Sequence, residues 1–200
     1  MNGIINVYKE RGFTSHDVVA KLRGILHMKK IGHTGTLDPD ATGVLPVCLG
    51  KATKVCGLLT DKDKTYRAVV KLGVMTNTED MTGEILAKHP VLVTKEQIER
   101  AVSKFVGEIE QVPPMYSAIK INGKKLYELA RQGKEVERKA RKVTIYGIKV
   151  LSIDFSENEF TMEVSCSKGT YIRTLCKDIG EFLGLSLIHI SEPTRQEAIS

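Results

Sequence analysis

The apolar positions of the chain recur with two different spacings, which separate the expected helices from the expected strands. Apolar residues fall three or four positions apart in 15–26, 94–106 and 172–183, and this spacing predicts amphipathic helices. In 65–73 and 160–167 they alternate with polar residues, which predicts strands with one buried face. The alternation over 160–167 is typical of a half-buried antiparallel sheet. The pattern therefore predicts a chain built from both helices and strands.

Short apolar runs and turn residues mark the remaining expected elements. Further strands are expected at 4–8, 44–49, 118–121 and 142–155, and further helices at 52–59 and 125–132. Thr94 and Gln97 have the spacing of a capping box, and Gly184 stands where the last helix should end. Between these elements, the prolines of Gln111–Ser117 predict an irregular segment.

The stretch from Gly32 to Leu45 is expected to be a shaped loop, because its three glycines and one proline disfavour a regular helix or a central strand. Asp38 directly precedes Pro39, which holds its backbone outside the helical region. A carboxylate presented from such a loop can act as a nucleophile or a general base. The alternative is an Asx-turn in which Asp38 bonds only its own backbone.

The composition is that of a globular protein. The 200 residues are 42% hydrophobic and 27% charged, and no apolar run approaches the length of a membrane span. The N-terminus lacks the layout of a signal peptide, and the four cysteines form no C-x-x-C pair. We therefore expect a cytoplasmic protein with reduced thiols and no metal site.

The net charge of +6 is concentrated in one segment. Residues 113–142 contain nine Lys or Arg and three Glu, and the rest of the chain is balanced. Such a concentration favours contact with a polyanion such as nucleic acid, although a solvated helix face would have the same composition.

Several other residues allow a binding interpretation beside a structural one. Tyr66 could be an aromatic at the edge of the core or a surface on which a base stacks. Lys29 and Lys30 could attract phosphate to the Gly32 loop or be solvated charges at a helix end. Arg173, at the start of a helix, is unfavourably placed beside the positive end of the helix dipole, and an anionic partner would explain it. Gly50-Lys51 fails as a phosphate-binding P-loop, because the glycine spacing is wrong and Ala52 follows the lysine.

Six ordered motifs, taken together, resemble the bacterial TruB-type tRNA pseudouridine-55 synthases. They are Gly32-His-Thr-Gly-Thr-Leu-Asp38-Pro, Ala41-Thr-Gly-Val-Leu-Pro46, Lys64-Thr-Tyr66, Pro113-Pro-Met-Tyr-Ser-Ala118, Leu126-Tyr-Glu-Leu-Ala-Arg-Gln-Gly133 and Gly169-Thr-Tyr-Ile-Arg173. Any one of them alone would be a weak signal. The resemblance runs from about Gly3 to Gly184, and the occurrence of all six motifs in order within that span makes it specific.

The resemblance implies an α+β pseudouridine synthase fold, in which a mixed, mainly antiparallel sheet is flanked by helices and loops. It implies an isomerase that converts uridine to pseudouridine in the T-loop of tRNA, at position 55, without metal or organic cofactor. Asp38 would be the catalytic carboxylate, either attacking C1′ or removing a sugar proton, and Arg173 would pair with it. Tyr66 and Tyr171 would hold the flipped uridine, and His33 would fill the space that the base leaves. Asp40 has no place in the family pattern.

The expected partner is the T-arm stem-loop of tRNA, bound by a monomer. Residues 113–142 would form a basic insertion that closes over the RNA, so affinity should fall with salt. The expected contacts with the RNA backbone are Lys29, Lys30, Lys64, Lys124, Lys125, Arg138 and Lys139.

The C-terminal sequence departs from the family pattern after about Leu185. We expect residues 1–185 to form the catalytic domain and 186–200 to be a tail foreign to the family, with the C-terminal RNA-binding domain absent. The activity of this chain could then be impaired.

Two competing functions remain open at this point. An inactive RNA-binding or tRNA-folding module would use the basic insertion and not Asp38. A nucleotide-binding enzyme would use the Gly32 loop, but the failed P-loop pattern weakens that interpretation.

Overall fold

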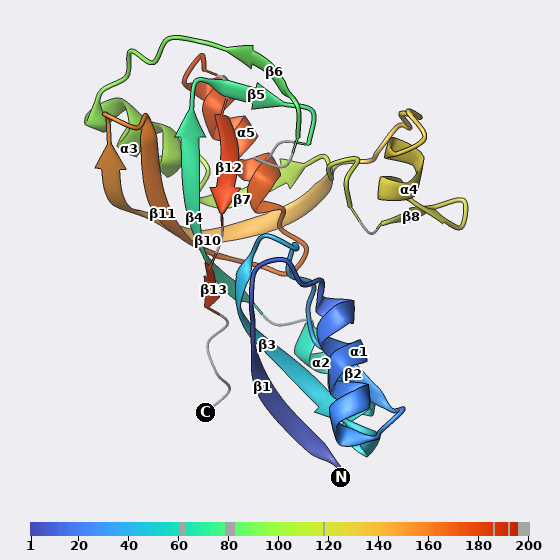
Figure 1. The fold of residues 1–200 in the computed structure, drawn as a ribbon. Helices are drawn as coiled ribbons and strands as arrows, with labels where there is room; N and C mark the ends of the chain where they lie inside the picture. The colour runs from blue at the N-terminus through green and yellow to red at the C-terminus, as the bar shows by residue number, and fades with distance from the viewer. Residues whose placement is uncertain (61–62, 79–82, 118, 186, 192, 196–200) are drawn as a thin grey trace.

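The computed structural model covers residues 1–200 and describes all of them except 61–62, 79–82, 118, 186, 192 and 196–200. A single twisted sheet runs through the molecule in the strand order β1-β3-β13-β4-β11-β10-β7, with β2 added against β3 and β12 against β4. Figure 1 shows β1 and β3 in a lower lobe and β4, β10 and β11 in an upper lobe.

The lower lobe is built on three antiparallel strands, with one helix packed against them. It contains β1 (Gly3–Lys9), α1 (Ser15–Leu26), β2 (Ile31–His33) and β3 (Thr42–Leu49). β1 pairs with β3 along its whole length, from Gly3 opposite Leu49 to Lys9 opposite Gly43. The apolar face of α1 packs with inward residues of these strands in a separate hydrophobic core.

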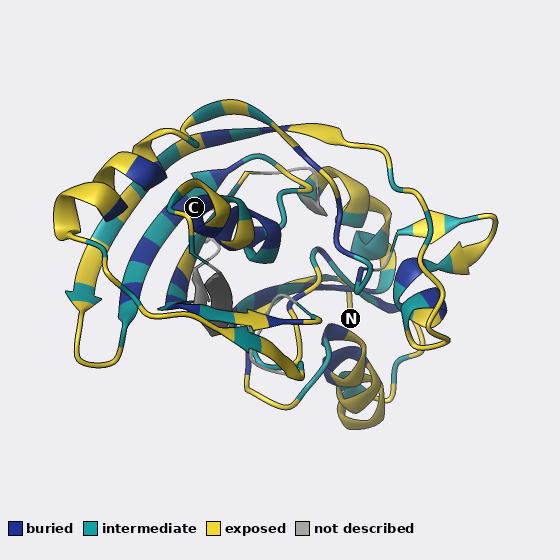
Figure 2. Ribbon diagram, turned by 90° about the horizontal axis from the view of Figure 1, so that it is seen from above, coloured by how far each residue is buried: buried dark blue, intermediate teal, exposed yellow. Residues whose placement is uncertain are grey.

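The upper lobe holds the larger core. Its strands are β4 (Lys64–Leu72), β7 (Gly107–Gln111), β10 (Arg141–Asp154) and β11 (Glu159–Cys166). Its helices are α3 (Lys95–Ser103) and α5 (Ile172–Phe182). Buried residues of α3 and α5 pack against the inward side chains of β4 and β11, and Figure 2 shows buried residues on the inner sides of the helices. This arrangement confirms the predicted α+β class.

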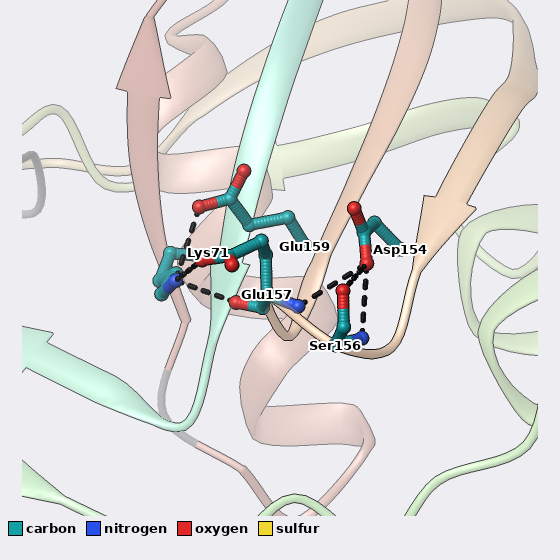
Figure 3. A network of polar contacts seen from close by, with 5 residues as sticks. All are labelled: Lys71, Asp154, Ser156, Glu157 and Glu159. Atoms are coloured by element: carbon teal, nitrogen blue, oxygen red, sulfur yellow. Dashed lines mark hydrogen bonds and ion pairs between the residues drawn. The ribbon is translucent and has the colours of Figure 1, made fainter.

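A polar turn closes the β10–β11 hairpin at the end of the upper lobe (Figure 3). One carboxylate oxygen of Asp154 accepts hydrogen bonds from the Ser156 backbone N–H (2.9 Å), the Ser156 hydroxyl (2.6 Å) and the Glu157 N–H (3.2 Å). These bonds hold the pKa of Asp154 below its ordinary value. On the neighbouring strand, Lys71 Nζ lies 3.0 Å from Glu159 Oε1. These contacts order the hairpin turn and join β4 to β11.

The basic segment forms an arm that projects from the sheet (Figure 1). Its elements are β8 (Lys120–Ile121), β9 (Lys124–Lys125) and the short helix α4 (Leu126–Ala130). The strand expected at 118–121 is limited to the last two residues, and residue 118 lies outside the described residues. The helix expected at 125–132 ends two residues early, because turns closed at Gln132 and Gly133 replace its last part.

Other boundaries also differ from the expectations. The helix expected at 52–59 is a 3-10 helix η1 (Gly50–Val55) followed by the short α2 (Cys56–Thr60). The loop expected at 32–45 is shorter, since β2 includes Gly32 and His33 and β3 begins at Thr42. Pairing with neighbouring strands overrides the glycine and proline signals there. β5 (Val74–Thr76) pairs with β6 (Ile85–Lys88), and none of β5, β6 and β7 was expected.

The C-terminal residues contribute backbone pairing to the sheet. β12 (Leu187–Ser191) pairs with β4, and β13 (Pro193–Arg195) lies between β3 and β4. The expected foreign origin of residues 186–200 stays a prediction. Among the helices of the described residues, none has the length and apolarity required to cross a membrane.

Candidate active site

Asp38 lies in the loop between β2 and β3, and its carboxylate is half exposed. The turn at this position is closed by backbone atoms, since Ala41 N–H donates to the Asp38 carbonyl at 3.0 Å. The carboxylate is directed elsewhere: its Oδ2 lies 3.3 Å from Arg173 Nε. The turn therefore leaves the carboxylate available for a partner outside the loop, which is unlike the Asx-turn alternative.

Arg173 reaches Asp38 from the other lobe. It is the second residue of α5, and its side chain is only 10% exposed, whereas that of Asp38 is 49% exposed. Its Nη2 also donates to the Tyr116 carbonyl at 3.1 Å, so the guanidinium is held from two sides. The position of Arg173 at the start of a helix indicated an anionic partner, and in the structure that partner is Asp38. The pairing expected from the resemblance is present in the structure.

Tyr171 stands beside this pair, immediately before the first residue of α5. Burial raises the pKa of its phenol above the ordinary value of 10.0, while the Ser117 hydroxyl and the positive charges of Arg141 and Arg173 act in the opposite direction. The negative charge of Asp38 contributes to the upward shift. The phenol therefore stays neutral near pH 7 and offers a partly buried aromatic surface next to the carboxylate.

The backbone on both sides of Asp38 is tied to the segment between β1 and α1. Leu37 N–H donates to the buried hydroxyl of Ser15 at 3.0 Å. The Pro39 carbonyl accepts from Gly12 N–H at 2.8 Å and from Lys9 Nζ at 3.2 Å. The loop that presents Asp38 is therefore held rigidly against the lower lobe.

Lys9 is a buried lysine that the sequence analysis did not single out. Its ammonium donates to the carbonyls of Phe13 (2.7 Å), Glu10 (3.0 Å) and Pro39. Burial lowers its pKa from the ordinary 10.5, and the charges of Asp38 and Asp40 act against that shift. The sequence contained a signal for the burial of Lys9, because this residue continues the inward-facing positions of Ile5 and Val7 in β1.

His33 ends β2 and lines a hollow beside the Asp38 loop. Its ring lies edge-on to His16, with ring centroids 5.1 Å apart, and its Nδ1 contacts the Gly35 carbonyl. Burial lowers the pKa of His33, so the imidazole is neutral near pH 7. The hollow has a volume of about 520 Å³, and Lys29 and Lys30 are among its lining residues. The structure thus groups His33, expected at the substrate, with Lys29 and Lys30, expected at the RNA backbone, next to the Asp38 loop.

Tyr66 and Lys64 lie on β4. Tyr66 is partly buried and packs against the larger core, opposite Val164 of β11. Lys64, the first residue of β4, is partly buried and lies opposite Cys166. Their expected contacts with RNA stay predictions.

The expected RNA-contacting cations of the arm differ in how firmly they are held. Lys124 and Lys139 are exposed. Lys125 Nζ donates to the Tyr127 hydroxyl at 3.1 Å, and Arg138 donates to the Pro113 carbonyl at 3.1 Å and pairs with Glu135 at 3.3 Å. Arg138 therefore has a structural role, because it holds the later part of the arm against Pro113 at the beginning of the arm.

This arrangement suits acid–base or nucleophilic chemistry by one carboxylate. Arg173 holds the Asp38 carboxylate at Oδ2, and the carboxylate is exposed enough to reach a substrate. Within the part of the chain that the structure describes, no three His, Cys, Asp or Glu side chains gather as metal ligands would.

Replacing Lys9 with methionine should loosen the Asp38 loop. Lys9→Met removes the ammonium and leaves the Phe13 and Glu10 carbonyls without this donor, which should lower the free energy of unfolding by about 1–3 kcal/mol. Urea unfolding followed by circular dichroism measures the change. Lys51→Met, at an exposed position, is the control and should stay within about 0.5 kcal/mol of the original chain. Equal midpoints for the two variants would contradict this role of Lys9.

Comparison with known proteins agrees with the geometry. The model of the family "TruB family pseudouridylate synthase (N terminal domain)" matches residues 23–172. The tRNA pseudouridine synthase B of Alkaliphilus oremlandii is 61% identical over 184 residues, which are 92% of this chain and 61% of the relative. That of Clostridium perfringens strain 13 is 54% identical over 208 aligned residues, covering all of this chain and 70% of the relative. The chain spans about three fifths of the length of the first of these relatives.

Solved structures show the same fold. A Cbf5-Nop10-Gar1 complex contains a chain that is 34% identical, with a TM-score of 0.76 over 97% of this chain and 48% of that chain. An H/ACA RNP bound to a substrate RNA contains one that is 31% identical, with a TM-score of 0.71 over 97% of this chain and 47% of that chain. These matches confirm the resemblance on which the expected fold was based. The chain belongs to the TruB family of pseudouridylate synthases.

Proposed function

We propose that this chain isomerises uridine to pseudouridine in the T-loop of tRNA, at position 55, with Asp38 as the catalytic carboxylate. The observation that carries the proposal is the ion pair between Asp38 and Arg173. It holds a half-exposed carboxylate on a loop whose backbone is fixed by Ser15, Gly12 and Lys9. The names of the relatives support the choice of tRNA as the substrate.

The chemistry requires one bond to break and another to form. The N1–C1′ glycosidic bond breaks, the base turns, C5 bonds to C1′, and the proton leaves C5 while N1 gains one. Asp38 either attacks C1′ or removes a sugar proton to start this sequence, and both routes need its ionised form. Because Arg173 holds the carboxylate in place, it is the second residue of the proposed mechanism.

Access to the uridine requires that the base leave its stack. Tyr171, partly buried beside the ion pair, and Tyr66 on β4 would hold the extruded base. His33, neutral and at the edge of the hollow, would take the space that the base vacates. Lys29 and Lys30 would attract the neighbouring phosphates.

We propose the domain organisation that the resemblance implies. Residues 1–185 would form the catalytic domain, residues 113–142 would close over the T-arm, and the tail after Leu185 would be foreign to the family. We further propose a cytoplasmic monomer that needs no cofactor.

Replacing Asp38 with asparagine should separate catalysis from binding. Asp38→Asn keeps the shape of the side chain but removes the anion, so pseudouridine formation in a T-arm stem-loop RNA should fall at least about 10³-fold. Chromatography of the digested nucleosides measures product, and fluorescence anisotropy should show RNA affinity within about threefold of the original chain. Asp40→Asn, two residues away, is the matched control. An Asp38→Asn variant that still forms pseudouridine would refute Asp38 as the catalytic carboxylate. An original chain that binds the RNA but forms no pseudouridine would favour the RNA-binding module instead.

Neutralising two exposed cations of the arm should reduce the salt dependence of RNA binding. Lys124→Gln combined with Lys139→Gln removes two charges, so the slope of log affinity against log salt should fall by about 1.4–1.8. A double variant of exposed lysines outside the arm, Lys88→Gln with Lys104→Gln, should leave the slope unchanged. Identical slopes for both double variants would exclude the arm as the phosphate contact.

A further inference from the structure

Gln111 is a buried amide that makes two hydrogen bonds to the backbone of one distant residue. It is the last residue of β7 and is 2% exposed. Its Oε1 accepts from Tyr171 N–H at 3.0 Å, and its Nε2 donates to the Tyr171 carbonyl at 3.2 Å. One side chain thus satisfies both backbone groups of Tyr171, sixty residues along the chain.

Tyr171 is the N-cap of α5, and this position lacks the local cap that other helices of the chain have. In α1 and α3 the cap is a threonine, and the third helical residue, Asp17 or Gln97, accepts the backbone N–H of that threonine. In α5 the N-cap is a tyrosine without a side-chain cap bond. The third residue of α5 is Thr174, whose buried hydroxyl has no hydrogen-bond partner within the described structure.

Gln111 therefore does for α5 what Asp17 and Gln97 do for their own helices, but from a different strand. It accepts the N–H of the N-cap residue and so determines at which residue the helix begins. The start of α5 matters because Arg173 is its second residue. A slip of the α5 sequence by one residue along the helix would rotate the Arg173 side chain by about 100°.

We infer that Gln111 is a positioning residue for the proposed reaction: it fixes the start of α5 so that Tyr171 and Arg173 face Asp38. This inference rests on the proposed function. The segment after Gln111 supports the same geometry, since the Tyr116 carbonyl accepts from Arg173 Nη2 at 3.1 Å. The strand end and the Pro113 segment together hold both the helix start and the guanidinium.

The first test is independent of activity. In the original chain the Tyr171 amide should exchange slowly with solvent, and NMR should show contacts between the Gln111 carboxamide protons and the Tyr171 amide. Gln111→Met keeps the length of the side chain but cannot bond, so exchange of the Tyr171 amide should accelerate by at least about tenfold. Glu110→Leu, on the exposed side of the same strand, should leave it unchanged. If the carboxamide contact is absent from the original chain, the inference falls even if Gln111→Met does not fold.

The second test separates positioning from general stability. With a T-arm stem-loop RNA, Gln111→Met should lower kcat by about 10–100-fold and change KM by less than about twofold, because the arm and the hollow still bind the RNA. Gln111→Glu keeps the acceptor for Tyr171 N–H and loses the donor. Its kcat should therefore lie between that of the original chain and that of Gln111→Met. An unchanged kcat in folded Gln111→Met overturns the inference. An original chain that makes no pseudouridine overturns the proposed function instead, and the exchange test still decides the contact.

Discussion

The ion pair between Asp38 and Arg173 joins two parts of the molecule that have separate hydrophobic cores. Asp38 belongs to the loop beside the smaller core, and Arg173 to the helix packed on the larger one. Because Arg173 is largely buried, its charge requires an anion or backbone acceptors, and it has both. The geometry of the candidate active site therefore depends on how the two lobes are held by the continuous sheet.

Each partner of this pair is fixed by its own set of backbone contacts. On one side, Ser15, Gly12 and Lys9 hold the residues next to Asp38. On the other side, Gln111 holds the residue that begins the helix of Arg173. The side chains of Lys9 and Gln111 are both buried and both bind main-chain atoms. Such contacts restrict the loop and the helix start without approaching a substrate, which leaves the exposed side of Asp38 free for chemistry.

Positive charge is arranged in two places around this centre. Lys29 and Lys30 line the hollow beside His33, and the arm presents Lys124 and Lys139 to solvent. The arm also contains cations that are engaged within the protein, such as Arg138 with the Pro113 carbonyl. A count of charges cannot separate these two groups, because only the contacts show which cations hold the arm together and which remain exposed for a polyanion.

The sequence by itself determined the main helices, the long antiparallel strands and the family, because amphipathic spacing and ordered motifs are local properties of the chain. Motif resemblance also named Asp38 and Arg173, and the structure places them in contact. The sequence patterns could not predict β6 and β7, the shorter Asp38 loop, or the division of the helix at 52–59. These features depend on pairing and packing with distant residues. For the same reason Lys9 and Gln111 were missed. Gln111 bonds to the main chain of Tyr171, and Lys9 bonds to the Pro39 carbonyl as well as to nearby carbonyls. Only the tertiary structure brings the distant atoms of Tyr171 and Pro39 within hydrogen-bonding distance.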